Sequence, residues 1–212
     1  MGESSHPEGR PSDGGRGPAG PLWVAPDAYG QAEALTSMGT VAAPLLGGFS
    51  LAAMVQTITL RPSDARWPDA AMVLFLLAAV LFIGTVQALF WARRYQVTPA
   101  EIMGWWPDAD DRIDQLRDEQ AQHARAFGRW STLGRFTYDF ALLCLLAALT
   151  ILAVPPGSHG HAPVLRWVGV AVGAAAFAAE VIWIAAASKA SRRALSLLTS
   201  RRRSGITVGK RL

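Results

Sequence analysis

Two long stretches without a charged residue constrain this chain more than any other feature. No Asp, Glu, Lys or Arg occurs across residues 34–60 or across residues 70–92. Each stretch exceeds the roughly 20 residues that a helix, rising about 1.5 Å per residue, needs to cross a hydrocarbon core of about 30 Å. A soluble helical bundle would need a charged face on each helix, and these stretches have none. They therefore predict two transmembrane helices.

Two further apolar stretches, 136–154 and 164–188, contain one acidic residue each, Asp139 and Glu180. Their apolar residues run on without the alternation of a barrel strand, which favours helices. The sequence thus predicts an all-α, polytopic membrane protein with four transmembrane helices.

Positive charge is distributed unevenly between the two ends of these stretches. Seventeen of the twenty Lys and Arg residues lie in the N-terminal tail, in the segment 93–135 or after residue 188. Only Arg61, Arg66 and Arg166 lie in the two other connectors. Because Lys and Arg are retained on the cytoplasmic side, we expect a multi-pass protein of the cytoplasmic membrane with both termini and the 93–135 loop in the cytoplasm.

Four spans leave no room for a separate folded domain. We expect one membrane domain at 33–188, an N-terminal tail at 1–32 and a basic tail at 189–212. The N-terminal tail is rich in Gly, Pro and Ser and is predicted to be disordered. The basic tail either anchors the topology or binds anionic lipid at about 1 kcal/mol per charge. Because orientation explains the charge, no nucleic-acid partner is predicted.

The 93–135 loop begins with a helix-start signal. Thr98, Pro99 and Glu101 form the capping-box pattern, with an N-cap hydroxyl, Pro at the first helical position and Glu three residues after the cap. A short helix is therefore predicted, ending at Pro107. Its tryptophans, Trp105 and Trp106, are expected either at the membrane interface or packed against protein.

A single apolar seam follows, with spacings of three and four residues that predict an amphipathic cytoplasmic helix continuous with the third span. The seam comprises Ile113, Leu116, Gln120, His123, Phe127 and Trp130. We expect it to dock either on the cytoplasmic ends of the same chain or on a second copy. It spans fewer than three heptads, too few for a coiled coil to be inferred, so a homo-oligomer is a hypothesis.

Three groups of residues suggest chemistry but fit structural roles better. An acidic run has neither the Gly nor the closing Glu of a calcium loop, and it suits the start of a helix: Asp108, Asp110, Asp111 and Asp114. His159 and His161 form at most part of a metal site. His123 and Cys144 are 21 residues apart, about 31 Å along one helix, which is too far for a catalytic pair. We therefore predict no metal, cofactor or catalytic residue, and no enzyme.

Glu180 is the hardest residue to explain structurally. It lies eight residues before Ser188, about 12 Å into the membrane. A charge near the centre of a span costs about 2.5–3.5 kcal/mol on insertion scales, so the side chain should face protein or water. It shares a helix face with the small residues Gly169 and Gly173, a spacing that allows close helix packing.

Polar residues at a similar depth on the other spans are its expected partners in an intramembrane node: Thr40, whose carbonyl Pro44 leaves without a donor, together with Thr85 and Gln87. Such a node serves either as a proton or cation relay or as a hydrogen-bonded clasp between helices. With no second acid in line, the clasp is favoured.

Several motifs carry a resemblance to a family. Phe90-Trp91-Ala92-Arg93-Arg94, the capping box, Trp105-Trp106-Pro107 and Tyr138 at the head of the third span resemble small four-span integral membrane proteins of actinobacteria whose activity is not established. Arg outnumbers Lys by 18 to 2 and Asn is absent, as in high-GC genomes. The resemblance covers residues 33–188 and implies topology and compartment only. We expect an accessory or interaction protein that acts through the cytoplasmic helix and the basic tail. The alternative is a small oligomeric ion or proton channel or transporter that uses Glu180.

Overall fold

The computed structural model describes residues 31–59, 65–106, 111–156 and 164–207, with side chains up to Lys189. Within these ranges the chain is helical and has no strand. The N-terminal tail, the acids Asp108 and Asp110, the histidines His159 and His161 and the side chains of the basic tail lie outside the described residues.

Four helices are long and apolar enough to cross a membrane, which confirms the prediction of four spans. The elements are α1 (Gln31–Ser37), η1 (Met38–Ala42), α2 (Ala43–Ile58), α3 (Pro68–Arg94), α4 (Pro99–Trp105), α5 (Ile113–Ala153) and α6 (Val164–Thr207). The first three form one continuous 28-residue span. α5 joins the predicted seam helix and the third span into a single helix of 41 residues.

Pro44 explains an irregularity in the first span. Proline has no N–H and cannot donate to the carbonyl four residues before it, here that of Thr40. The backbone instead widens into the π-helical turn η1, where the N–H of Ala43 donates to the carbonyl of Met38, five residues back. The span passes the proline without breaking.

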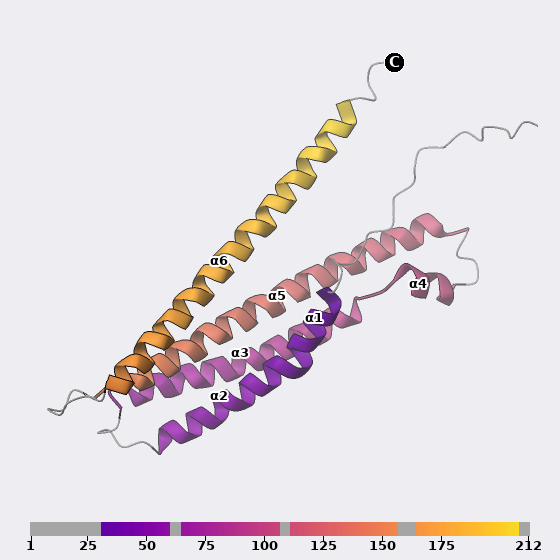
Figure 1. Ribbon diagram of the computed structural model, residues 1–212. Helices are drawn as coiled ribbons and strands as arrows, with labels where there is room; N and C mark the ends of the chain where they lie inside the picture. Colours follow the sequence, from indigo (N-terminus) through magenta and orange to yellow (C-terminus); the bar gives the residue numbers. More distant parts are fainter. Residues whose placement is uncertain (1–30, 60–64, 107–110, 157–163, 208–212) are drawn as a thin grey trace, which may run out of the picture.

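α3 is the central helix of the bundle and packs against both α2 and α5 (Figure 1). Every buried residue of the main core cluster comes from these three helices: Ala43, Ala71, Phe75, Ala78, Phe82, Ala141, Cys144, Leu145 and Ala148. Alanines let the backbones approach closely, as is usual between membrane helices, and the two phenylalanines fill the remaining space.

A second cluster lies where the C-terminal end of α3 meets α1 and α5. Its buried members are Leu35, Leu89, Ala92 and Phe127. Leu89 fits between two glycines: a Cβ added at Gly39 would lie 3.0 Å from Leu89 Cδ1, and one at Gly134 would lie 2.7 Å from Leu89 Cδ2. The side chain of Leu89 thus fixes the register of three helical segments at once.

α6 is the peripheral helix. It packs against α5, and the two helices diverge toward the C-terminal end of α6 (Figure 1). Contact is closest where a Cβ at Gly173 would meet the Thr150 side chain and one at Gly169 would lie 3.7 Å from Ala153 Cβ. Among residues with described side chains, none from α6 belongs to either core cluster. The bundle is therefore a packed three-helix core with a fourth helix on one side.

Candidate functional site

α5 and α6 diverge toward the C-terminal end of α6, and the region between their facing sides is here called the α5–α6 wedge (Figure 1). Its closed end holds an apolar cavity of about 250 Å³ lined by Ala147, Thr150, Ile151, Ala174 and Phe177. Thr150 does not add a free donor, because its hydroxyl donates to the carbonyl of Leu146 at 2.7 Å. The cavity itself is therefore suited to hydrocarbon.

Glu180 lies on the α6 face that borders the wedge. It follows Phe177 by three residues and Gly173 by seven, spacings that keep all three on one side of a helix. Gly173 contacts Thr150, so this side faces α5. The Glu180 side chain is half-buried.

Asp139 borders the same wedge from α5. It precedes Thr150 by 11 residues, just over three helical turns, so both lie on the face of α5 that meets α6. From the Gly173–Thr150 contact, Glu180 is about 10 Å and Asp139 about 16 Å along the helices, a difference in depth of about 6 Å. Tyr138 is within electrostatic range of both acids. The wedge therefore brings a second acid and a phenol near Glu180.

The other residues predicted for the Glu180 node lie elsewhere. The hydroxyls of Thr85 and Thr137 lie 3.0 Å apart, joining α3 to α5. Thr40 is exposed and its hydroxyl donates to the carbonyl of Thr36 at 2.7 Å, while Gln87 is exposed on α3. Similar depth did not bring these side chains to one site, because depth leaves open which way each helix is rotated. Of the packing residues, both Gly169 and Gly173 face α5.

The predicted seam faces the chain's own helices. Leu116, Gln120 and Phe127 are buried, and the other three members, Ile113, His123 and Trp130, are half-buried. α4 packs on α5 and contributes the buried Ile102. Of the two docking modes expected from the sequence, the structure contains the one within a single chain.

Ring contacts fasten the seam to the end of α3. Trp130 stacks on Trp91 with ring centroids 6.1 Å apart, and His123 meets Tyr95 edge-on at 5.9 Å. Arg94 lies over the Trp91 ring at 4.7 Å. We call these five residues the aromatic junction. Such contacts contribute about 0.5–1.5 kcal/mol each beyond burial, so the junction holds the projecting half of α5 at a set angle.

α4 begins as its sequence predicts. Glu101 N donates to Thr98 Oγ1 at 3.3 Å, and Thr98 N donates back to Glu101 Oε2 at 2.7 Å. The Glu101 carboxyl accepts from Thr98 N and also from Thr98 Oγ1, at 2.8 Å, and these two hydrogen bonds, backbone first, hold its pKa below the usual 4.5. The helix ends at Trp105, two residues before the expected Pro107, and both Trp105 and Trp106 are exposed.

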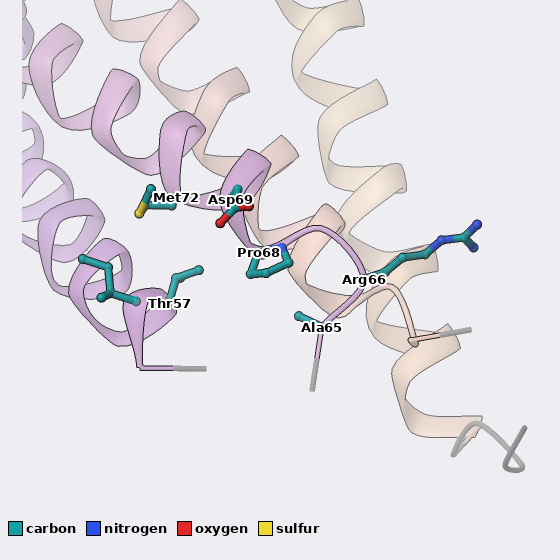
Figure 2. Close-up of a pocket in the computed structure, with 7 residues that line it drawn as sticks. Thr57, Ala65, Arg66, Pro68, Asp69 and Met72 are labelled. Carbon is teal, nitrogen blue, oxygen red and sulfur yellow. The ribbon is translucent and has the colours of Figure 1, made fainter. Parts of the chain in front are cut away.

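A second hollow lies at the end of the bundle remote from α4, between the end of α2 and the start of α3 (Figure 2). It measures about 370 Å³ and is lined by Thr57, Ile58, Ala65, Arg66, Pro68, Asp69 and Met72. Arg66 points away from it and lies over the Trp67 ring at 4.7 Å. The Thr57 hydroxyl donates to the carbonyl of Ala53. Asp69, in the first turn of α3, complements the helix dipole, so the described residues of this lining form no ligand-binding set.

Metal and nucleophilic chemistry find little basis in the described residues. They contain no group of three or more His, Cys, Asp or Glu side chains close enough to bind a metal ion. His123 and Cys144 lie on one continuous α5, so their separation of 21 residues remains about 31 Å. Cys144 is buried in the core cluster.

Comparison with known proteins leaves these sites to be judged on their own geometry. No protein-family model matches the chain, and no curated protein or solved structure is similar to it.

Proposed function

We propose that this chain is an integral protein of the cytoplasmic membrane that acts as an accessory or interaction protein, presenting the projecting half of α5 and the basic tail to cytoplasmic partners. We also propose that it belongs with the small four-span membrane proteins of actinobacteria. The uneven distribution of Lys and Arg supports the orientation, with both termini inside.

The length of α5 carries the proposal. Of its 41 residues, about 20 suffice to cross the bilayer, so the first 20 or so project about 30 Å beyond it. A helix that only connected two spans would not need this length. The aromatic junction and Ile102 occupy one side of the projection, so its other side is available to partners.

The available side has a graded charge. Its exposed residues, from the far end toward the span, are Asp114, Gln115, Asp118, Glu119, Gln122, Arg125 and Arg129. The acids lie farthest from the membrane, and the bases lie nearest to it, where anionic headgroups attract them. α6 runs as a helix to Thr207, about 28 Å past Ser188, and carries the basic tail on the same end of the bundle (Figure 1).

Site-specific photocrosslinking in native membranes tests the proposal. A photoreactive residue at Gln115 or Gln122 should form adducts with another polypeptide, whereas one at the buried Leu116 should crosslink only within the chain. Adducts of the same mass as a dimer would identify the partner as a second copy. Absence of any adduct to another chain from both exposed positions would contradict the proposal.

The orientation has its own test. Cys144 is buried, so cysteines introduced at exposed sites can be labelled against a low background. A membrane-impermeant maleimide should modify Arg125→Cys only from the cytoplasmic side, and Arg66→Cys only from the opposite side. The reverse pattern would refute the orientation.

A second candidate is an ion or proton conductor built on Glu180. The observation that favours it is the second acid, Asp139, at the same wedge. Liposome flux should then be lost in Glu180→Gln while the variant remains folded; an undiminished flux, or none in the wild type, would remove this candidate.

A further inference from the structure

The α5–α6 wedge combines two features. One is the apolar cavity of about 250 Å³, slightly below the roughly 300–1,000 Å³ range of small-molecule pockets. The other is a half-buried carboxyl, Glu180, less than one helical turn from the cavity-lining Phe177. An apolar hollow with an acid at its rim has the shape and charge to receive an apolar body that carries a positive charge.

Among the residues with described side chains, none forms an ion pair with the Glu180 carboxyl. α6 packs on α5, and the ionisable side chains of α5 around this depth are Cys144, which is buried in the core, and Tyr138 and Asp139 farther out; none of the three is a base. The basic side chain closest to them, Arg135, lies one turn nearer the end of the span and interacts with Asp139. A ligand cation would supply the missing positive charge.

The depth of Glu180 in its span decides whether a free organic cation or the amine of a lipid headgroup can reach its carboxyl. Glu180 lies about 12 Å inside the end of the span, whereas the headgroups of bilayer lipids remain outside the hydrocarbon core. A phospholipid amine therefore stays above the carboxyl. A cation whose charge is spread over an apolar body can enter the core and reach it, because the cost of its transfer from water is low.

We propose that the α5–α6 wedge is a binding site for lipophilic organic cations, with the apolar body in the cavity lined by Ala174 and Phe177 and the charge beside Glu180. Asp139 lies farther out on the α5 side of the wedge and provides an acidic approach path. The proposal is independent of the interaction role of α5. It shares Glu180 with the conduction candidate but requires binding only, so saturable binding without flux separates the two.

The test uses two probes of nearly the same size and opposite charge, tetraphenylphosphonium and tetraphenylborate. The full chain is reconstituted in nanodiscs of zwitterionic lipid, and binding is measured by equilibrium dialysis with empty nanodiscs subtracted. We expect saturable binding of the phosphonium and none of the borate. Equal binding of both probes, or no saturable binding of the phosphonium, would overturn the proposal.

Two variants assign the binding to the wedge. Glu180→Gln keeps the size and removes the charge, and it should weaken phosphonium binding at least tenfold. Ala174→Leu should do the same by filling the cavity. Ala175→Leu is the matched control, because Ala175 is exposed on the opposite side of α6, and its affinity should stay within twofold of wild type.

Folding is checked by the thermal unfolding of each variant, followed by tryptophan fluorescence. A folded Glu180→Gln that binds as tightly as wild type would overturn the role of the carboxyl. If Ala174→Leu instead dissociates an oligomer found in the wild type, the cavity holds a second copy of the chain and the proposal is wrong. Asp139→Asn should reduce affinity less than Glu180→Gln does; a greater reduction would place the charge site at Asp139.

Discussion

The placement of Leu89 between two glycines leads to a quantitative prediction. Replacing Gly134 with Ala would put a methyl group 2.7 Å from Leu89 Cδ2 and 2.9 Å from Leu89 Cγ. Carbon atoms in contact prefer about 3.5–4.0 Å, so the overlap is about 1 Å at two atoms. Leu89 is 3% exposed, with Gly39 packed against its other side, and cannot simply move away.

The magnitude follows from two opposing terms. Gly to Ala inside a helix gains about 1 kcal/mol from propensity, whereas overpacking a filled core costs about 1–3 kcal/mol. Gly134→Ala should therefore change the free energy of unfolding by about 0 to −2 kcal/mol. The matched control is Gly128→Ala on the same helix, where an added Cβ meets nothing within 4 Å. The control should be stabilised by up to about 1 kcal/mol, so the two substitutions should differ by about 1–3 kcal/mol.

A double-mutant cycle isolates the steric term. Leu89→Ala alone should destabilise by about 2–5 kcal/mol, because it leaves a cavity against both glycines. With Leu89 shortened, the Gly134 methyl group has room, and adding Gly134→Ala should stabilise the protein rather than destabilise it. The coupling energy should be about 1–3 kcal/mol and favourable. Unfolding in mixed micelles, followed by the fluorescence of Trp91 and Trp130 beside the cluster, measures all four corners. Strict additivity would refute the packing described for Leu89.

Three further predictions rest on single contacts. Because the pKa of Glu101 is lowered in the folded state, the capping box stabilises α4 above pH 4.5, and this contribution disappears as the pH falls through the lower, folded value. The protection factors of the α4 amides, corrected for the pH dependence of intrinsic exchange, should fall there in the wild type and stay constant in Glu101→Gln over the same range. The Thr85–Thr137 hydrogen bond should show a coupling of only about 0.6 kcal/mol between Thr85→Val and Thr137→Val, because each hydroxyl has a single proton and an alternative acceptor in a carbonyl of its own helix; a coupling above about 2 kcal/mol would contradict this geometry. Cys144, 6% exposed, should react with a membrane-permeant maleimide at least tenfold more slowly than Ala174→Cys in the wedge, and equal rates would contradict its burial against α3.

The sequence predicted the four long apolar helices and the capping of α4. Charge-free stretches locate spans because an unpaired charge in hydrocarbon is costly, and the spacing from Thr98 to Glu101 marks a helix start because both side chains must reach the same backbone groups. The seam from Ile113 to Trp130 was predicted from apolar spacings of three and four residues, and its members are buried or half-buried in the structure.

Rotation and tilt were not accessible in the same way. Thr85 was expected beside Glu180, but its partner is Thr137, a residue of the third span that was not singled out from the sequence. Asp139 was noted only as the one acid of the third stretch, and its place at the wedge was missed. The spacing of 11 residues between Asp139 and Thr150 contains that information, yet it becomes meaningful only once Thr150 is known to touch Gly173. Such contacts depend on how two helices cross, which the residues of either helix alone do not determine.

The peripheral position of α6 has a consequence for how the protein is made. Both core clusters are built from residues between Leu35 and Ala148, with packing partners no later than Leu152. A nascent chain that has released α5 into the membrane therefore already holds every side chain of its core, before translation of the last helix is finished. α6 is added to an assembled three-helix unit, so a chain stopped at residue 156 should insert and fold its core, and would lack α6 together with the wedge and the basic tail.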